Sequence, residues 1–232
     1  MMGVMTDALP TPNTDPLTPA QAWATLRAGN DRFVADVPLH PSQGADRRRE
    51  TSVAQHPHTV IFGCSDSRVA AEIIFDQGLG DTFVVRTAGH VLDTTVIGSI
   101  EYGVDVLDVP LVVVLGHDSC GAVGAAVHTL TTGEQASGFV RAVVDRVIPS
   151  IVNITGAHGG TLDGISPDVL RREHVRHTVD MLHSYSAGLA AAVAEGRCAI
   201  VGVEYDLSEG RARLVDVVGD VGEQPLVGHA AH

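Results

Sequence analysis

The chain has few cysteines, few basic residues and no long apolar run. Its three cysteines, Cys64, Cys120 and Cys198, do not have the spacing of a disulfide framework. Its 15 basic residues, all arginines, stand against 28 aspartates and glutamates, and the formal net charge of −13 opposes binding to nucleic acid or to an anionic membrane. We therefore expect neither of these as a partner.

The sequence also lacks the signals of export and of membrane insertion. The N-terminus has no basic region followed by an apolar stretch, and no run of about 18 apolar residues occurs anywhere. Together with the small number of cysteines, this pattern predicts a soluble protein of the reducing cytoplasm.

The 232 residues, 44% of them hydrophobic, are enough for one domain with a substantial core. Residues 1–16 carry several prolines among small polar residues, and we expect a flexible arm there and a single domain over 17–232. Thr18-Pro19-Ala20-Gln21 has the form of a capping box that opens a helix. Trp23 is predicted to dock this helix onto the core or onto a partner subunit.

Short apolar runs rich in β-branched residues alternate with longer helical patterns from residue 59 onwards. The predicted strands and helices are, in order, Thr59–Gly63, Val69–Gln77, Thr82–Arg86, Thr94–Leu107, Leu111–Gly116 and Gly121–Leu130. This alternation is typical of an α/β fold, with a mostly parallel central sheet and helices on both faces.

The rest of the chain is predicted to add helices and one antiparallel edge. We expect helices over Gly138–Val152 and Pro167–Ala194, with a loop over Thr155–Gly160 between them. Cys198–Leu207 and Arg211–Val218 resemble a hairpin that supplies an antiparallel edge strand.

Three metal-ligating side chains stand at the ends of two predicted strands. Cys64 follows the first strand, and His117 follows the third, with Cys120 three residues further on. Ligands of parallel sheets bind beyond the carboxyl ends of the strands, so the three side chains should converge on one metal ion. Two thiolates and an imidazole suit zinc, and three protein ligands leave a fourth position open for catalysis.

Asp66 and Arg68 follow Cys64 closely, and they allow two forms of the zinc site. In a closed site, Asp66 is a fourth ligand. In an open site, Arg68 forms a bidentate pair with Asp66 and holds the carboxylate off the metal. The free carboxylate can then accept the proton of a zinc-bound hydroxide and orient it toward substrate.

Cys64 and Cys120 could instead serve as a phosphatase-type nucleophile or as a redox pair. A phosphatase-type loop needs arginine six residues after its cysteine, but Ala70 and Ala126 occupy those places. A Cys-x-x-Cys redox motif is absent, although two adjacent thiols could still form a disulfide after metal loss.

Cys64-Ser-Asp66-Ser-Arg68 followed by His117-Asp-Ser-Cys120 resembles the β-class carbonic anhydrases, over roughly Gln21 to Val217. The resemblance implies that zinc is bound by the two cysteines and the histidine, and that Asp66 and Arg68 form a catalytic dyad. It also implies reversible hydration of carbon dioxide to bicarbonate and a proton by zinc-bound hydroxide, within one catalytic domain.

The resemblance is to the plant-like branch of that family. It implies that Gln55 hydrogen-bonds bicarbonate from across a dimer interface, and that Phe83 and Tyr102 line the substrate pocket. Gly121 would offer its backbone N–H to the substrate at a helix N-terminus. A branch regulated by bicarbonate has tryptophan where this chain has Ile61. We therefore expect an open site in an obligate homodimer that can pair into a tetramer.

Two rival functions remain at this stage. One is a related zinc hydrolase acting on carbon disulfide or carbonyl sulfide, and the other is a non-catalytic zinc or bicarbonate sensor. The intact Asp66 and Arg68 argue against a sensor, which needs no positioned base.

Most of the 12 histidines and the third cysteine are given no chemical role. Cys198 is predicted to be a small buried residue, and His90 lies near the proposed cleft without an assigned function. The histidines predicted to lie on the solvated surface are His40, His56, His58, His158, His174, His177, His183, His229 and His232.

Overall fold

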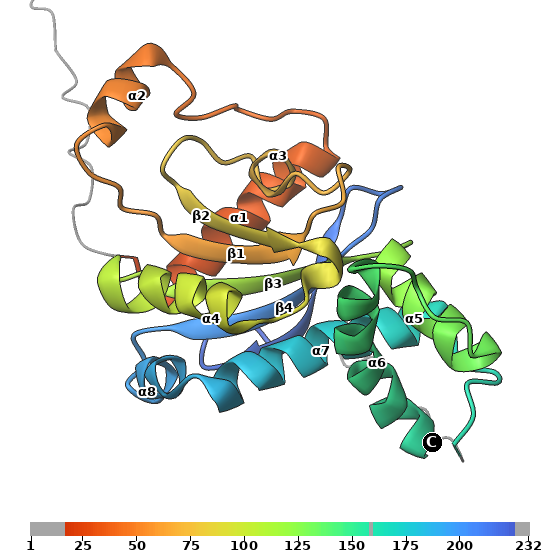
Figure 1. The fold of residues 1–232 in the computed structure, drawn as a ribbon. Helices are drawn as coiled ribbons and strands as arrows, with labels where there is room; N and C mark the ends of the chain where they lie inside the picture. The colour runs from red at the N-terminus through yellow and green to blue at the C-terminus, as the bar shows by residue number, and fades with distance from the viewer. Residues whose placement is uncertain (1–16, 158–159, 226–232) are drawn as a thin grey trace, which may run out of the picture.

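The computed structural model describes residues 17–157 and 160–225, and the predicted arm over 1–16 lies outside them. The described residues form a five-stranded sheet with the order β2-β1-β3-β4-β5 (Figure 1). The strands are β1 (Thr59–Cys64), β2 (Thr82–Thr87), β3 (Leu111–His117), β4 (Ala199–Tyr205) and β5 (Ala212–Val218). β1, β2, β3 and β4 are mutually parallel, and β5 pairs antiparallel with β4, which confirms the predicted sheet.

Helices cover both faces of this sheet. They are α1 (Pro19–Val34), α2 (Ala45–Thr51), α3 (Ala71–Ile74), α4 (Thr94–Glu101), α5 (Gly121–Thr132), α6 (Val140–Ala157), α7 (Pro167–Tyr185) and α8 (Ala187–Ala194). α1 and α3 share one hydrophobic core with the sheet, and α4, α7 and α8 share another on the opposite face. β1 and β3 are buried along their whole length, as their continuous apolar sequences predict.

α5 and α6 lie beyond the end of the sheet rather than over its faces (Figure 1). They form a third apolar cluster together with Cys64 and Cys120. The sheet changes its winding direction at β1, because β2 lies on one side of it and β3 on the other. The carboxyl ends of β1 and β3 therefore form the switch point at which open α/β sheets bind ligands. α5 and α6 lie beyond this end of the sheet (Figure 1).

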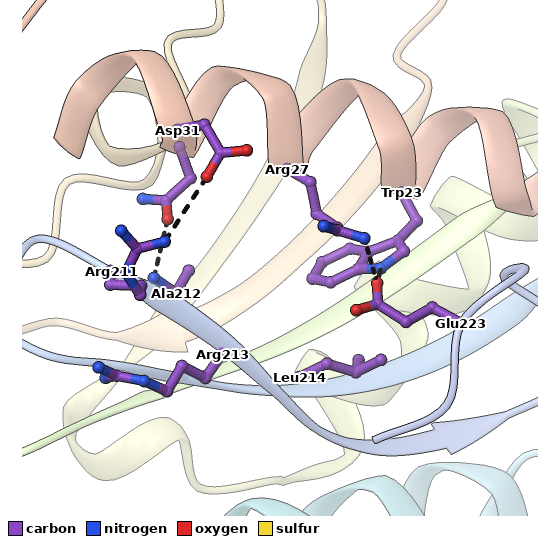
Figure 2. Close-up of a pocket in the computed structure, with 9 residues that line it drawn as sticks. Trp23, Arg27, Asp31, Arg211, Ala212, Arg213, Leu214 and Glu223 are labelled. Carbon is purple, nitrogen blue, oxygen red and sulfur yellow. Dashed lines mark hydrogen bonds and ion pairs between the residues drawn. The ribbon is translucent and has the colours of Figure 1, made fainter. Parts of the chain in front are cut away.

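The N-terminal helix is fastened to the sheet by buried and charged contacts. Thr18 and Gln21 form the predicted capping box, and Trp23, which is 2% exposed, packs into the core. Figure 2 shows that the indole Nε1 of Trp23 and Nη1 of Arg27 both donate to Oε2 of Glu223, over 2.8 and 2.7 Å. These contacts confirm the docking role of Trp23 on its own core.

Three predicted segments differ from the structure. The helix predicted over Val69–Gln77 is reduced to α3, because Asp76 turns to a φ of 46° and its carboxylate accepts Arg32 Nε over 2.6 Å. The helix predicted over Pro167–Ala194 is interrupted at Ser186, which is extended and caps α8. α6 continues to Ala157, into the predicted loop.

Two further helical segments complete the connections. A 3₁₀ turn, η1 (Ala88–His90), follows β2, and α4 continues into a π-helix, η2 (Tyr102–Val106), within the helix predicted over Thr94–Leu107. No helix among the described residues is long and apolar enough to cross a bilayer.

Candidate metal centre

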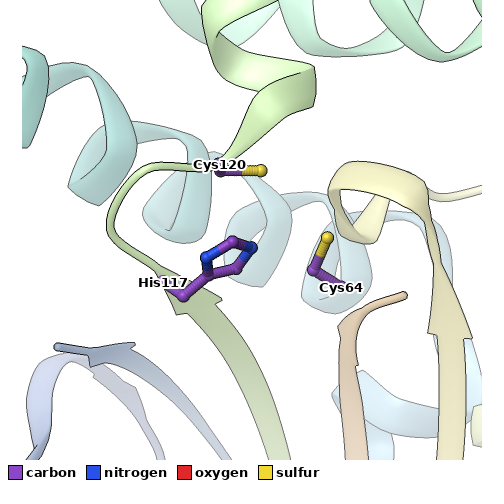
Figure 3. A group of neighbouring side chains, drawn as sticks. All are labelled: Cys64, His117 and Cys120. Atoms are coloured by element: carbon purple, nitrogen blue, oxygen red, sulfur yellow. The ribbon is translucent and has the colours of Figure 1, made fainter. Parts of the chain in front are cut away.

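The sheet brings Cys64, His117 and Cys120 together at its carboxyl edge. Cys64 is the last residue of β1, His117 is the last of β3, and Cys120 is the N-cap of α5. Their sulfur and nitrogen ligand atoms all lie within 4.8 Å of one another (Figure 3). The three side chains are buried, with 6%, 1% and 5% exposure. The predicted convergence of two thiols and one imidazole is therefore present.

The imidazole of His117 is prepared to bind a metal ion. Nδ1 lies 2.7 Å from the carbonyl oxygen of Asp118, which can only accept, so Nδ1 carries the proton. Nε2 is then a lone-pair donor, and this buried atom has no hydrogen-bond partner. A buried nitrogen without a partner is costly unless it binds a ligand. Two sulfurs and this nitrogen fit zinc in charge and in softness.

The two thiols are electrostatically unequal. A hydrogen bond from the Cys120 thiol lowers the pKa of Cys64 well below its usual value. Interaction with Cys64, reinforced by burial, raises the pKa of Cys120. Without a metal, one thiolate is thus stabilised by the proton of the other thiol. Both cysteines would hold a divalent ion such as zinc as thiolates, with loss of this proton.

Asp66 and Arg68 form the bidentate pair expected of an open site. Nε and Nη2 of Arg68 donate to the two carboxylate oxygens of Asp66 over 3.0 and 2.7 Å, and the backbone N–H of Arg68 adds a bond of 2.9 Å. These bonds hold the pKa of Asp66 well below its usual range. Among the described residues, the group of potential metal ligands consists of Cys64, His117 and Cys120 and does not include Asp66.

Comparison with known proteins agrees with this geometry. The sequence model of the carbonic anhydrase family matches residues 59–212, about two thirds of the chain. Carbonic anhydrase 2 of Mycobacterium tuberculosis is 54% identical over 214 residues, which cover 92% of this chain and 99% of that protein. This chain belongs to the carbonic anhydrase family.

Other members of the family extend the comparison. The carbonic anhydrase of Mycolicibacterium smegmatis is 55% identical over 213 residues, 91% of this chain and 99% of its own length. A tetrameric β-carbonic anhydrase of Sordaria macrospora superposes with a TM-score of 0.63 at 23% identity, over 72% of this chain and 84% of that one. The fold is that of the β-carbonic anhydrases, and the rival hydrolase and sensor functions are not favoured.

The predicted pocket residues do not gather around this chain's own metal group. Phe83 and Tyr102 are in contact with each other, with ring centroids 6.1 Å apart. Phe83 pairs with Val60 near the start of β1, whereas the metal ligand Cys64 ends that strand. Val60 and Cys64 are four residues apart along β1, which corresponds to a distance of about 13 Å along the strand. Within one chain, these rings therefore lie away from Cys64.

Gln55 and Gly121 occupy opposite ends of the sheet. Gln55 is exposed in the segment before β1, beside His56, which lines a cavity of about 810 Å³ at the amino ends of the strands. Gly121 is the first residue of α5 and directly follows the ligand Cys120. Gly121 is thus adjacent to the metal group, whereas Gln55 is remote from it within one chain.

Arg86 is a site residue that the sequence analysis did not single out. It lies near the end of β2, opposite Gly63 of β1, and its guanidinium donates two hydrogen bonds, of 2.9 and 2.7 Å, to the carbonyl oxygen of Cys64. A third bond, of 2.6 Å, reaches the carbonyl oxygen of Asp66. Arg86 therefore holds the backbone that carries Cys64, a member of the metal group, and Asp66. The targets are backbone atoms, which a side-chain motif does not reveal.

Two histidines lie buried behind the metal group. The prediction that His174 is on the solvated surface is wrong, since it is 2% exposed, and His90 is equally buried. Burial lowers the pKa of His174 to about 4 and lowers that of His90 well below its usual value. One face of α7 carries residues at intervals of four, namely Leu170, His174, Thr178 and Leu182, and all of them are buried. This periodicity was the signal that could have placed His174 in the core.

The buried His174 makes stability sensitive to acid. Its pKa is about 4 in the folded protein and about 6.5 in an unfolded chain. The unfolded state therefore binds more protons between these values, and stability falls as the pH drops from about 6.5 to about 4. Between pH 7 and 4.5 we expect His174 to account for about 2 kcal/mol of the loss. Urea unfolding of the wild type and His174→Gln at both pH values measures it, and an equal acid loss in both proteins would contradict it.

Proposed function

We propose that this chain catalyses the reversible hydration of carbon dioxide to bicarbonate at a zinc ion bound by Cys64, His117 and Cys120. The observation that carries the proposal is the buried, unpartnered Nε2 of His117, within 4.8 Å of two sulfurs. Zinc bound by three protein ligands supplies Lewis acidity that lets a water molecule react as a nucleophile near neutral pH.

The residues around the metal group then divide the remaining work. The carboxylate of Asp66 accepts a hydrogen bond from the attacking oxygen and so directs a lone pair of that oxygen at carbon dioxide. Arg68 keeps this carboxylate ionised and turned away from the metal, through the two bonds described above. The backbone N–H of Gly121, at the N-terminus of α5, is suited to the developing negative charge of bicarbonate.

We further propose that the active unit is a homodimer in the cytoplasm, that residues 17–232 form one catalytic domain, and that dimers can pair into a tetramer. Phe83, Tyr102 and Gln55 lie at the end of the sheet away from their own metal group, so they can complete a site only in a partner. β2 is an edge strand of the sheet and carries three consecutive apolar residues, Phe83, Val84 and Val85, which a second copy would cover.

Stopped-flow measurement of carbon dioxide hydration against pH, with metal analysis of the same samples, tests the reaction. We expect about one zinc per chain and an activity that rises toward alkaline pH, because the nucleophile must lose a proton. Zinc-loaded protein with no hydration above the uncatalysed rate would refute the catalytic function.

The role of Gln55 across the interface predicts complementation between two defective subunits. Gln55→Ala removes one substrate hydrogen bond and should lower kcat/KM about tenfold. A heterodimer of Gln55→Ala with Cys64→Ala contains one metal site that receives an intact Gln55 from the other chain. We expect such a heterodimer to have about half of the wild-type activity, like the matched heterodimer of wild type with Cys64→Ala. If Gln55 served its own site, the mixed heterodimer would have only about half of the lowered activity of Gln55→Ala.

A further inference from the structure

The backbone N–H and carbonyl groups of Gly89 connect the metal group to helix α7. Its N–H donates to the sulfur of Cys64 over 3.3 Å. Its carbonyl oxygen lies 2.8 Å from Nε2 of His174. Gly89 has a φ of 65°, and a Cβ at this position would lie 2.5 Å from Cβ of Ala122. The backbone therefore passes between β2 and α5 in a conformation that only glycine fits.

The hydrogen bonds of His174 fix its tautomer. A carbonyl oxygen can only accept, so Nε2 donates its proton to Gly89, and Nδ1 of the neutral ring accepts. The hydroxyl of Ser150 lies 3.0 Å from Nδ1 and 2.6 Å from the carbonyl oxygen of Val147, so its single proton is shared between these two acceptors. Ser150 is fully buried, so water does not compete for these bonds. The donor nitrogen of the ring is thus directed at Gly89, and its other nitrogen lies beside the hydroxyl of Ser150.

His90 packs against the flat side of His174. The two ring centroids are 4.4 Å apart, with an interplanar angle of 37°. The ring of Phe62 also meets His90, in an edge-on arrangement with an interplanar angle of 80°. Neither ring nitrogen of His90 has a hydrogen-bond partner in the described part of the chain. His90 therefore acts as a packing group that limits rotation of the His174 ring.

We propose that His174 is a positioning residue for the metal centre: by binding the carbonyl oxygen of Gly89, it holds the Gly89 N–H on the sulfur of Cys64. The inference rests on the proposed zinc site, because an N–H bond to a thiolate matters most when that thiolate binds a metal. Groups that orient metal ligands in this way typically change metal affinity by about 10- to 100-fold when removed. His174 acts through one intervening residue, whose N–H and carbonyl group belong to two successive peptide units, so the lower end of this range applies.

Three substitutions at residue 174 separate the Gly89 bond from simple packing. His174→Gln places an amide N–H near the position of Nε2 and keeps the bond to Gly89. His174→Asn reaches only toward Ser150, and His174→Leu retains bulk without any donor. The measured quantity is the rate of zinc transfer from the zinc-loaded protein to a chromophoric chelator. This rate should stay within about threefold of wild type for the His174→Gln variant. It should rise about tenfold for the His174→Asn and His174→Leu variants.

A control substitution on the same helix accounts for lost stability. Thr178 is buried one turn further along α7, and its hydroxyl donates to the backbone carbonyl oxygen of His174 and not to that of Gly89. Thr178→Val removes a buried hydrogen bond of α7, and zinc transfer should remain within about threefold of wild type. With cobalt in place of zinc, the His174→Asn and His174→Gln variants should differ in the thiolate-to-cobalt charge-transfer absorption. This band should move to lower energy when the hydrogen bond from the Gly89 N–H to the Cys64 sulfur is lost.

The outcomes distinguish this inference from the zinc site itself. Faster transfer for Asn than for Gln, with an unchanged Thr178→Val, supports the positioning role even if His174→Leu fails to fold. Equal rates for Asn and Gln, or an equally fast Thr178→Val, overturn it while leaving the zinc site intact. A wild-type protein that binds no zinc would instead overturn the proposed function.

Discussion

Replacement of Cys64 by alanine removes zinc from the protein and abolishes carbon dioxide hydration above the uncatalysed rate. The binding free energy of zinc in structural peptide sites is about 10–16 kcal/mol. Divided over three or four ligands, this corresponds to about 4 kcal/mol for each ligand, or about 10³-fold in zinc affinity. Cys120→Ala and His117→Ala should act alike, because all three ligand atoms belong to one buried group. Metal analysis after dialysis and stopped-flow assays measure both losses.

Cys198 provides the matched control for this experiment. It is also a buried cysteine, 1% exposed, but it precedes β4 at the amino end of the sheet and does not belong to the metal group. Cys198→Ala should keep its full complement of zinc and its activity. Retention of zinc by Cys64→Ala, or loss of zinc by Cys198→Ala, would contradict the assigned ligands.

Asp66→Asn should retain zinc but lose about 100-fold in kcat/KM, because an amide cannot accept the nucleophile's proton as a carboxylate does. Asparagine has nearly the same shape, and its oxygen can still accept one bond from Arg68, so the loop should keep its conformation. The loss is expected across the whole pH range, since the bonds from Arg68 hold the pKa of Asp66 well below its usual range. Stopped-flow pH profiles, with metal analysis of the same samples, measure it.

Asp118→Asn tests whether the loss of kcat/KM in Asp66→Asn reflects the position of the Asp66 carboxylate or only the removal of a negative charge near the metal group. Asp118 also lies beside the metal group, but its Oδ1 accepts the backbone N–H of Leu207 over 2.7 Å. Its carboxylate therefore holds a loop, and we expect its amide variant to stay within about fivefold of wild type. Comparable losses in the two variants would show that negative charge near the metal, and not a positioned acceptor, sustains the reaction.

The metal group could be predicted from the sequence because each of its members ends a recognisable element. β1 and β3 are continuous apolar runs, and a parallel sheet aligns their carboxyl ends, so Cys64 and His117 had to be neighbours if the strands were adjacent. The Asp66–Arg68 pair was predictable for a similar reason, since its members are only two residues apart in one loop. Local pattern and sheet geometry were sufficient in both cases.

Features that depend on distant backbone atoms could not be predicted in the same way. Arg86 and His174 act on carbonyl oxygens of other segments, and every segment offers such oxygens. The short helix α3 ends where Asp76 is bound by the backbone N–H groups of Leu39 and His40, which lie far away in the sequence. Helical periodicity carries no information about partners of this kind.

X-ray absorption at the zinc edge of the wild-type protein is the most direct test of the central claim. Two cysteines and one histidine on a single ion predict two sulfur neighbours at about 2.3 Å, and one imidazole nitrogen and one further light atom at about 2.0–2.1 Å. A zinc shell with fewer than two sulfurs, or without imidazole scattering, would contradict the account.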